Sequence, residues 1–556
     1  MRGITRHEVD VGGRPVHYRR AGEGPPVVML HESPRSSLAL ARLASDLADR
    51  CTAIALDTPG YGGSAPLDLP QPEIADFADA LVATLDALGL DRVGLYGAHT
   101  GAQIVLETAA RHPGRIAVAI MDGLPVFTAE EQEEFLARYL PELVPQPDGS
   151  HLVWAWNRFR DQHVFWPWYR REQAARMPAR VPSARFLHEG ALDILRSGDY
   201  RIAYAAAFRY DPLPALAALR VPASIVARGG DALADHLPRL PGLPACCASE
   251  RLPGPRDGFV AGILRHLEPA LGLPAAPPPP SAGSVVGGIE RRTVSTAGGQ
   301  LLVRSAGPDG GRPVVLLPGT PGGALPLEPL VAALAPARRA LALDLPGHGD
   351  SDPLPAAEPA LADYARAIAE ALDRLVVREL DLYGTGTGAA IAVETALHLG
   401  ARVQGLVLDG LALPDDDARD DLLAHGFPDL APRWDGTHLL TAWQLVRDSC
   451  LWSPWYDRRP ERALSLPFYE DPALLHGLVV ELLRGCETFA RADGAVLAAP
   501  LRERLGLLRG RERLVAAARA GDPARASLGE VAELAGATPV VLAASLGALV
   551  DLLADA

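Results

Sequence analysis

The sequence predicts an α/β protein that contains the same domain twice, with a mainly parallel sheet covered by helices on both faces in each copy. Three observations lead to this prediction. The 556 residues are too many for one hydrophobic core. Short apolar runs alternate with longer helical patterns. Segments of the first half also recur, in the same order, in the second half.

The repeated segments stand on either side of a proline-rich stretch, LPAAPPPPSAGS, whose composition is that of an interdomain linker. We therefore expect the first copy at residues 1–272, the linker at 273–288 and the second copy at 289–556. Four pairs of segments correspond: 16–34 with 301–321, 53–64 with 340–351, 93–109 with 380–396, and 116–125 with 403–414.

In order along each copy, these segments have the patterns of recurring strands and turns. A strand ends in VVMLHESP or VVLLPGTP, and the next is followed by a D-x-P-G turn. A strand, turn and helix then surround GAHTG or GTGTG, and a further strand ends at Asp122 or Asp409, which we interpret as loop anchors. In parallel sheets, ligands bind at the carboxyl ends of the strands, so a site is expected near these turns.

The ordered motifs resemble the α/β-hydrolase fold over nearly the whole of both copies. This resemblance implies two tandem α/β-hydrolase-fold domains, each with a helical cap, at about 126–210 and about 414–495. More narrowly, HESPRSS together with GAHTG is similar to bacterial α/β-hydrolase-like proteins that are known by their fold alone. The resemblance carries the fold to both copies, and each site residue is compared separately.

The position that holds the nucleophile in the family has changed in both copies. The family motif is G-x-S-x-G, with the serine on a sharp turn between strand and helix. Gly97 and Gly101 remain, but His99 replaces the nucleophile, and Gly386 replaces it in the second copy. The backbone N–H of Thr100 belongs to the oxyanion hole in the family geometry. Because glycine has no side chain for chemistry, the second copy is expected to be non-catalytic.

The other parts of a serine-hydrolase mechanism are incomplete as well. The family's histidine base follows the last strand, where LPGPRDGF places Arg256 and Asp257, and the second copy ends without a histidine. The family's acid corresponds to Asp231 and, in our alignment, to Glu512. Glu32 in the oxyanion loop would repel a developing oxyanion. The sequence therefore predicts no serine-type mechanism in either copy.

His99 is the candidate acid/base group of the first copy, since an imidazole with a pKa of about 6.5 exchanges protons near neutral pH. Glu32 is the candidate to orient it or to share a proton, and Asp231 is either the retained acid or a leftover surface carboxylate. His31 is expected to be structural, as in the family, beside the pocket. His31, Glu32 and His99 could instead ligate zinc or iron, but no His-x-x-x-His or Cys-x-x-Cys pattern accompanies them, and we predict no metal.

An aromatic segment follows the sixth strand in both copies, DGSHLVWAWNRFRDQHVFWPWYRR at 148–171 and DGTHLLTAWQLVRDSCLWSPWYDR at 435–458. In the family it belongs to the cap over the active site. Arg160 could clamp a carboxylate, and Trp168 and Tyr169 offer stacking surfaces. The alternative is that these side chains form the core of the cap. The candidate substrate-binding residues are His31, Thr100, His151, Trp156, Arg160, His163, Trp168 and Tyr169.

The composition excludes several classes of function. All 53 basic residues are arginine, which excludes Schiff-base, pyridoxal phosphate and Walker-type phosphate chemistry. The net charge of −15 argues against a nucleic-acid partner. No apolar leader or membrane span is apparent, and the scattered cysteines fit a reducing cytoplasm. We expect a cytoplasmic protein without a cofactor that binds a small molecule and packs its two copies on each other.

The leading hypothesis is an atypical α/β-hydrolase-fold enzyme, a hydrolase or lyase of a small organic molecule, that uses His99 as acid/base in place of a serine nucleophile. Direct attack by water, elimination, decarboxylation or C–C cleavage would suit such a group. The competing hypothesis is an inactive pseudoenzyme that binds a ligand or serves as a scaffold. A cavity above His99, with a carboxylate in hydrogen-bond reach, would favour the enzyme.

Overall fold

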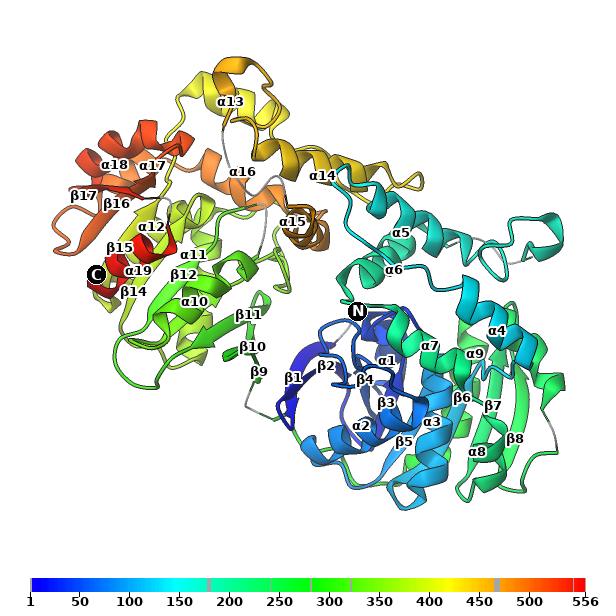
Figure 1. Ribbon diagram of the computed structural model, residues 1–556. Helices are drawn as coiled ribbons and strands as arrows, with labels where there is room; N and C mark the ends of the chain where they lie inside the picture. The colour runs from blue at the N-terminus through cyan, green and yellow to red at the C-terminus, as the bar shows by residue number, and fades with distance from the viewer. Residues whose placement is uncertain are drawn as a thin grey trace. The chain divides into compact units, whose positions relative to one another are not determined.

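The computed structural model describes residues 3–177, 182–240, 242–280, 283–320, 323–464, 471–543 and 545–555 (Figure 1). The chain divides into two compact units, Met1–Val144 with His151–Val285, and Pro145–Ser150 with Val286–Ala556. Each unit contains its own mainly parallel sheet with helices on both faces. The fold class predicted from the sequence is therefore confirmed in both copies.

The sheet of the first unit has eight strands in the order β1-β2-β4-β3-β5-β6-β7-β8. β1 pairs antiparallel with β2, and β2 with β4, whereas all pairs from β4 to β8 are parallel. Every residue of β3, β4 and β6 is buried, as expected for strands covered on both faces. The strand bounds are β1 (Thr5–Val11), β2 (Arg14–Ala21), β3 (Pro26–Leu30), β4 (Thr52–Leu56), β5 (Val93–Ala98), β6 (Ile116–Asp122), β7 (Ala223–Arg228) and β8 (Cys247–Leu252).

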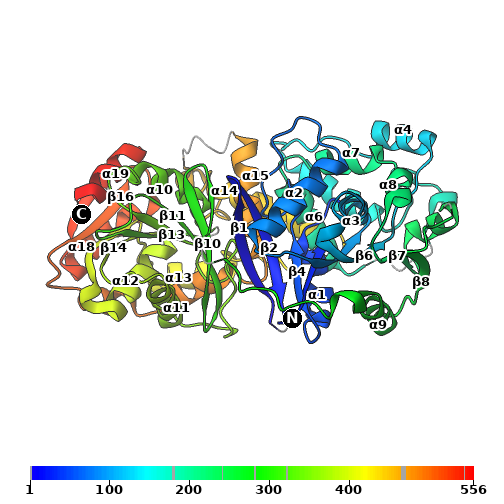
Figure 2. The same ribbon diagram turned by 90° about the horizontal axis from the view of Figure 1, so that it is seen from below.

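Helices cover both faces of this sheet, which lies between them in Figure 2. On one face α1 (Ala41–Leu47) contacts α9 (Arg256–Leu267), and their apolar side chains pack on β3, β4 and β6. On the other face α3 (Thr100–Arg111) contacts α2 (Ile74–Ala87) and α8 (Leu213–Ala218). The hydrophobic core therefore forms two layers, one on each side of the strands.

The second unit repeats this arrangement with nine strands in the order β17-β16-β15-β14-β12-β13-β11-β10-β9. α11 (Leu361–Arg374) and α12 (Thr387–Leu399) contact each other on one face, and α10 (Glu328–Leu334) and α19 (Leu546–Asp555) on the other. The strand bounds are β9 (Ser284–Val286), β10 (Ile289–Thr296), β11 (Gly299–Ala306), β12 (Val314–Leu317), β13 (Ala340–Leu343), β14 (Leu380–Thr385), β15 (Val403–Asp409), β16 (Leu514–Arg519) and β17 (Thr538–Leu542).

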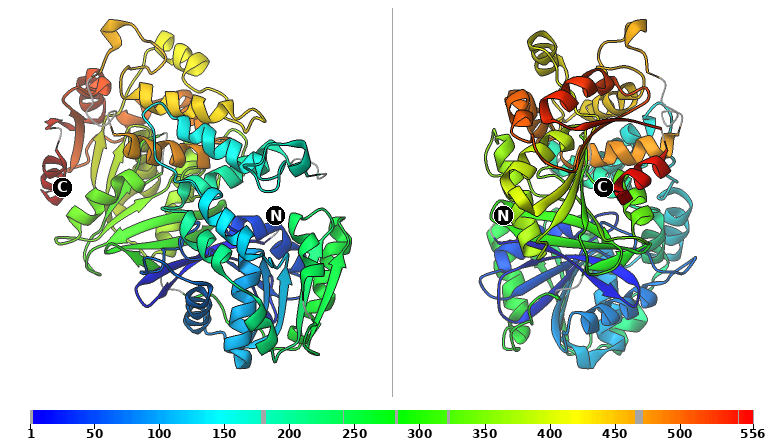
Figure 3. Two further views of the ribbon diagram at one scale, coloured as in Figure 1. Left: turned by 45° about the vertical axis from the view of Figure 1, so that its right-hand side comes forward. Right: turned by 90° about the vertical axis from the view of Figure 1, so that its left-hand side faces the viewer.

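Additional helices occupy the segments where the sequence predicts caps, between β6 and β7 and between β15 and β16 (Figure 3). Residues 178–181 and 465–470 of these segments lie outside the described residues. In the first unit the helices are α4 (Ala129–Arg138), α5 (Ser150–Asp161), α6 (Ala184–Arg196) and α7 (Arg201–Arg209). In the second unit they are α13 (Asp416–His425), α14 (Thr437–Ser449), α15 (Pro472–Arg484) and α16 (Ala490–Ala498). α17 (Leu501–Gly506) follows the cap segment, as α8 does in the first unit.

Candidate active site

His99 lies on the turn between β5 and α3. Its backbone has φ 47° and ψ −106°, a conformation that residues with side chains adopt only under constraint. A Cβ on Gly97 would lie 2.2 Å from the carbonyl oxygen of Gly101, and one on Gly101 would lie 2.4 Å from that of Leu30. Strand and helix therefore pack so closely that only glycine fits at positions 97 and 101, two residues before and two residues after His99.

The imidazole of His99 is paired with the carboxylate of Asp231, with 2.8 Å between Nε2 and Oδ2. Asp231 follows β7 and begins the short helix η4 (Ala232–Arg239), whose Leu233 N–H donates to the other carboxylate oxygen over 2.8 Å. Gly123 leaves room for the pair, because a Cβ there would lie 2.5 Å from Cδ2 of His99. Asp231 thus bonds directly to the side chain at the nucleophile position.

This pair sets the charge of His99. Burial lowers the pKa of His99, but the charge and hydrogen bond of Asp231, supported by Glu32 and Asp122, outweigh burial and raise the pKa to about 9. Burial raises the pKa of Asp231, but the charge and hydrogen bond of His99 outweigh burial, and the net pKa of Asp231 is lowered to about 2. At neutral pH His99 is therefore an imidazolium that can donate a proton, rather than the neutral base that an unperturbed histidine would provide.

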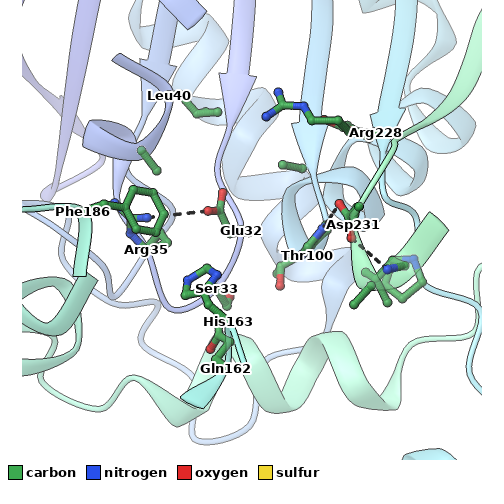
Figure 4. Close-up of a pocket in the computed structure, with 18 of the residues that line it drawn as sticks. Glu32, Ser33, Arg35, Leu40, Thr100, Gln162, His163, Phe186, Arg228 and Asp231 are labelled. Atoms are coloured by element: carbon green, nitrogen blue, oxygen red, sulfur yellow. Dashed lines mark hydrogen bonds and ion pairs between the residues drawn. The ribbon is translucent and has the colours of Figure 1, made fainter. Parts of the chain in front are cut away.

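Glu32 lies on the loop after β3 (Figure 4). It lines the same cavity as His99. Its carbonyl oxygen accepts the N–H of Arg35 over 2.9 Å, which closes a tight turn. Nη1 of Arg35 lies 4.0 Å from Oε1 of Glu32, and Nε of Arg35 donates to Asp193 over 2.9 Å. Burial raises the pKa of Glu32, but Arg35 and His99 outweigh it and hold the pKa below its ordinary value. Glu32 is therefore a carboxylate at neutral pH and can accept a proton.

These groups share one cavity of about 950 Å³. The structure brings five of the predicted residues to it, namely Glu32, His99, Thr100, His163 and Asp231. The His99 side chain is 37% exposed, so a molecule in the cavity can reach the imidazole. Burial lowers the pKa of His163 to about 4, which leaves its ring neutral at neutral pH. Aromatic side chains supply much of the remaining wall: Phe127, Tyr139, Trp166, Phe186, Tyr204 and Phe208.

The other predicted binding residues do not line this cavity, because they are engaged elsewhere in the unit. Nε1 of Trp168 donates to the carbonyl oxygen of Tyr139 over 3.1 Å, and the Tyr169 hydroxyl donates to Glu134 over 2.8 Å. Nε2 of His31 accepts the N–H of Thr58 over 2.9 Å and ties two loops together. The residues placed outside the cavity lining are His31, His151, Trp156, Arg160, Trp168 and Tyr169.

Two arginines, Arg35 and Arg228, were missed as cavity-lining groups, whereas Asp122 was considered from the sequence for a place at the cleft and was interpreted as a loop anchor. Arg35 follows β3, Asp122 ends β6 and Arg228 ends β7, and all three line the cavity. The hydroxyl of Tyr96 donates to Asp122 over 2.7 Å, and burial raises the pKa of Asp122 to about 6. Their positions at or after strand ends could have predicted a place in the cavity lining, since the carboxyl ends of parallel strands meet at one edge of a sheet.

The second unit has the same turn without an imidazole. Gly386 has φ 54° and ψ −121°, close to the values at His99. Asp522 follows β16 and begins the helix η10 (Pro523–Ser527), as Asp231 does after β7. Glu512 precedes β16, so our alignment of Glu512 with Asp231 is corrected: Asp522 holds the acid position.

A search of the described residues for groups of three or more His, Cys, Asp and Glu side chains arranged to hold a metal ion finds none. Within the same residues, no helix combines the length and apolar character needed to cross a membrane. The partner of the His99 imidazole is the carboxylate of Asp231.

Comparison with known proteins identifies one family and several distant relatives. The family model described as alpha/beta hydrolase fold matches residues 25–239 and 312–442. The sequence is 28% identical to a fluoroacetate dehalogenase from a Burkholderia species over 189 aligned residues. These residues cover 33% of this chain and 54% of the dehalogenase. It is also 29% identical to a haloalkane dehalogenase from Agrobacterium fabrum over 170 aligned residues, which cover 30% of this chain and 55% of that enzyme. The chain thus spans about half the length of the curated relatives it matches.

Among solved structures, the crystal structure of E-2-(acetamidomethylene)succinate hydrolase is similar to 48% of this chain. The similarity covers 99% of that chain, with 20% sequence identity and a TM-score of 0.36.

Proposed function

Because the chain belongs to the α/β hydrolase fold family, we propose that its first unit is an enzyme for a small organic molecule, with His99 as the proton donor and Glu32 as the proton acceptor. The activities named for the two relatives, on fluoroacetate and on haloalkanes, support a small organic substrate. The second unit is a non-catalytic partner in this proposal, since Gly386 and Gly319 stand where the first unit has His99 and Glu32.

The observation that carries the proposal is the pair of His99 and Asp231 at a cavity. In the serine mechanism, the acid orients a separate histidine that activates a hydroxyl. Here the acid bonds to the residue on the nucleophile turn itself, so the imidazole is both held in position and kept protonated. An imidazolium has no free lone pair with which to attack a carbonyl, but it is a good proton donor.

Opposite shifts in pKa assign the two roles. The pKa of His99 is raised to about 9, whereas the pKa of Glu32 is lowered, although both side chains line one cavity. Above the lowered pKa of Glu32 and below about 9, the pKa of His99, the carboxylate and the imidazolium coexist. A substrate placed between them meets a base and an acid that are both in the working state at neutral pH.

The pair supports reactions that need one proton removed and one proton supplied. Glu32 takes a proton from water, or from a carbon next to a carbonyl group, and His99 gives a proton to the leaving group. The first case is hydrolysis by direct attack of water, and the second is an elimination. In both, Glu32 gains the proton that the nucleophile or carbon loses, and no bond forms between enzyme and substrate.

The test is an activity screen of small esters, lactones and haloalkanoic acids with the wild-type protein and the His99→Ala variant. We expect the variant to lose a hundredfold or more of kcat/KM, on the order of what general acid catalysis contributes. His112→Ala, a change at a partly exposed histidine bonded to Asp79, is the matched control and should retain activity. Full activity in His99→Ala would remove this residue from the reaction.

A fluorophosphonate probe gives an independent test, because it labels activated serine nucleophiles. We expect no labelling of the wild-type chain. A labelled serine, or an acyl group found on any residue by mass spectrometry, would contradict the proposal.

A further inference from the structure

The second unit keeps a large cavity although it lacks the imidazole. This cavity measures about 970 Å³ and extends from the turn at Gly386 to the helices between β15 and β16. Small-molecule sites are commonly apolar cavities of this size with a few converging polar groups. Most of the lining is apolar, with aromatic and aliphatic side chains that include Leu411, Leu413, Phe427, Trp452, Trp455 and Phe489.

The carboxyl group of Asp493 reaches this cavity from α16, and Asp416, Glu503 and Asp522 also line it. The hydroxyl of Thr320 donates to its Oδ2 over 2.6 Å, and the hydroxyl of Thr387 donates to its Oδ1. The residue Asp493 is partly exposed and lines the cavity. Asp493 is the fourth residue of α16, and the fourth residue of α7 in the first unit is Tyr204. The first unit therefore has no carboxyl group at this position.

Within the part of the chain that the structure describes, Asp493 has no permanent positive partner. No arginine among the described residues forms an ion pair with it, and the chain contains no lysine. His348 would stabilise the Asp493 carboxylate if its ring were protonated, but burial lowers the pKa of His348, so the ring is neutral at neutral pH. The arginines of the cavity lining have carboxylate partners of their own: Arg419 pairs with Asp416, Arg502 with Glu530, and Arg519 with Asp409.

A carboxyl group in an apolar cavity is costly unless a cation or hydrogen-bond donors satisfy it. Two threonine hydroxyls satisfy one acceptor site on each oxygen of Asp493, and each oxygen can accept a further hydrogen bond. Aromatic faces such as those of Trp452 and Trp455 also attract cations. Burial raises the pKa of Asp493, and a positively charged donor bound beside it would favour the carboxylate form.

We propose that the cavity of the second unit binds a small organic amine, whose ammonium group pairs with Asp493 and whose apolar part contacts the aromatic lining. This site is separate from the one proposed for catalysis and does not depend on it. The ammonium group brings three N–H donors and a charge into a cavity that offers acceptors and ring faces.

The test is calorimetric titration of the full-length protein at neutral pH with benzylamine, and with benzyl alcohol and benzoate as neutral and anionic counterparts of similar shape. We expect benzylamine to bind about tenfold tighter than benzyl alcohol, the range for hydrogen bonds to charged groups, and benzoate to bind more weakly than either. Asp493→Asn should reduce benzylamine to the affinity of benzyl alcohol.

Glu32→Gln is the matched control, because it removes a carboxylate from the cavity of the first unit and should leave the preference for the amine unchanged. If Asp493→Asn does not fold, Asp493→Tyr, which installs the residue of the first unit, serves in its place. Equal affinities of amine and alcohol in the wild type, or a preference that survives the change at Asp493, would overturn the proposal. Loss of the preference in Glu32→Gln would place the amine in the first unit and also overturn it.

Discussion

The turn after β5 carries His99 in the first unit, and the turn after β14 carries Gly386 in the second. The two residues nevertheless have similar backbone conformations, with φ 47° at His99 and 54° at Gly386. The bond beneath the turn is also the same, since Tyr96 donates to Asp122 and Tyr383 to Asp409, each over 2.7 Å. The turn therefore keeps its shape without the side chain that it presents. Close packing between strand and helix sets the backbone, and chemistry is a separate property of the residue placed on it.

The charges of the two cavities differ far more than their backbones. In the first unit, Glu32 and His99 supply an opposite pair, and Asp231 holds the proton on the imidazole. In the second unit both of these positions are glycine, and the carboxyl group of Asp493 comes from the helices between β15 and β16 instead. The following changes test whether the shared backbone and the unshared charges are independent.

The largest effect is expected from crowding the shared turn. A Cβ on Gly97 would lie 2.2 Å from the Gly101 carbonyl oxygen, and one on Gly384 would lie 2.3 Å from that of Gly388. Gly97→Ala and Gly384→Ala should each lower the free energy of unfolding of their own unit by about 3 kcal/mol. Denaturant unfolding followed by circular dichroism measures this. A large loss in one unit and none in the other would show that the two turns are not equivalent.

Removing the proton acceptor should affect the first unit alone. Glu32→Gln keeps the shape of the side chain and removes its negative charge, so kcat/KM should fall about a hundredfold. The matched change in the second unit is Glu503→Gln, at a carboxylate that lines the other cavity, and it should leave the rate unchanged. The rate with a substrate found in the activity screen is the measurement, and equal losses in both variants would contradict the assignment.

The pH dependence tests the acid. With His99 as proton donor, the wild-type rate should be constant through neutral pH and fall as the pH rises through about 9, where the imidazolium is lost. In Asp231→Asn, burial acts without the opposing carboxylate, so the pKa of His99 falls and the decline begins at lower pH. At neutral pH this should cost about tenfold. Asp522→Asn is the control, and a shifted profile there would link the second unit to the reaction.

The smallest effect is expected from restoring the missing side chain. Among the atoms of the described residues, a Cβ on Gly386 would have the Gly319 Cα alone within 4 Å, at 3.7 Å. Gly386→His should therefore fit at a cost of about 1 kcal/mol for the backbone conformation. The new imidazole would lie near Asp522, as His99 lies near Asp231. Nuclear magnetic resonance should show one additional histidine with a pKa above 6.5. An ordinary or lowered pKa would mean that Asp522 is not placed like Asp231.

The fold and the turn could be predicted because their signals are local. Gly97, His99 and Gly101 lie within five residues of one another. The close packing of strand and helix requires glycine at positions 97 and 101, and both glycines can be read directly from the sequence. The bond from His99 to Asp231 joins residues 132 positions apart. In the related fold that acid serves another histidine, so its contact with His99 did not follow from the resemblance.

Side-chain direction could not be predicted from the aromatic segment. Trp156 and Trp168 occur in a pattern that suits either a pocket or a core, and packing among the helices turned both away from the cavity. The alignment of Glu512 failed for a similar reason. Its charged neighbourhood resembles that of Asp231, but the boundary of β16, which decides which acidic residue follows the strand, is not visible in the local sequence.

The pKa of His99, measured by the pH titration of its ¹⁵N-labelled ring and assigned by the signal lost in His99→Ala, tests most directly whether Asp231 keeps this imidazole protonated. We predict a midpoint near pH 9 in the wild type, and a lower midpoint in Asp231→Asn. A wild-type midpoint at or below 6.5, unchanged in Asp231→Asn, would contradict the account.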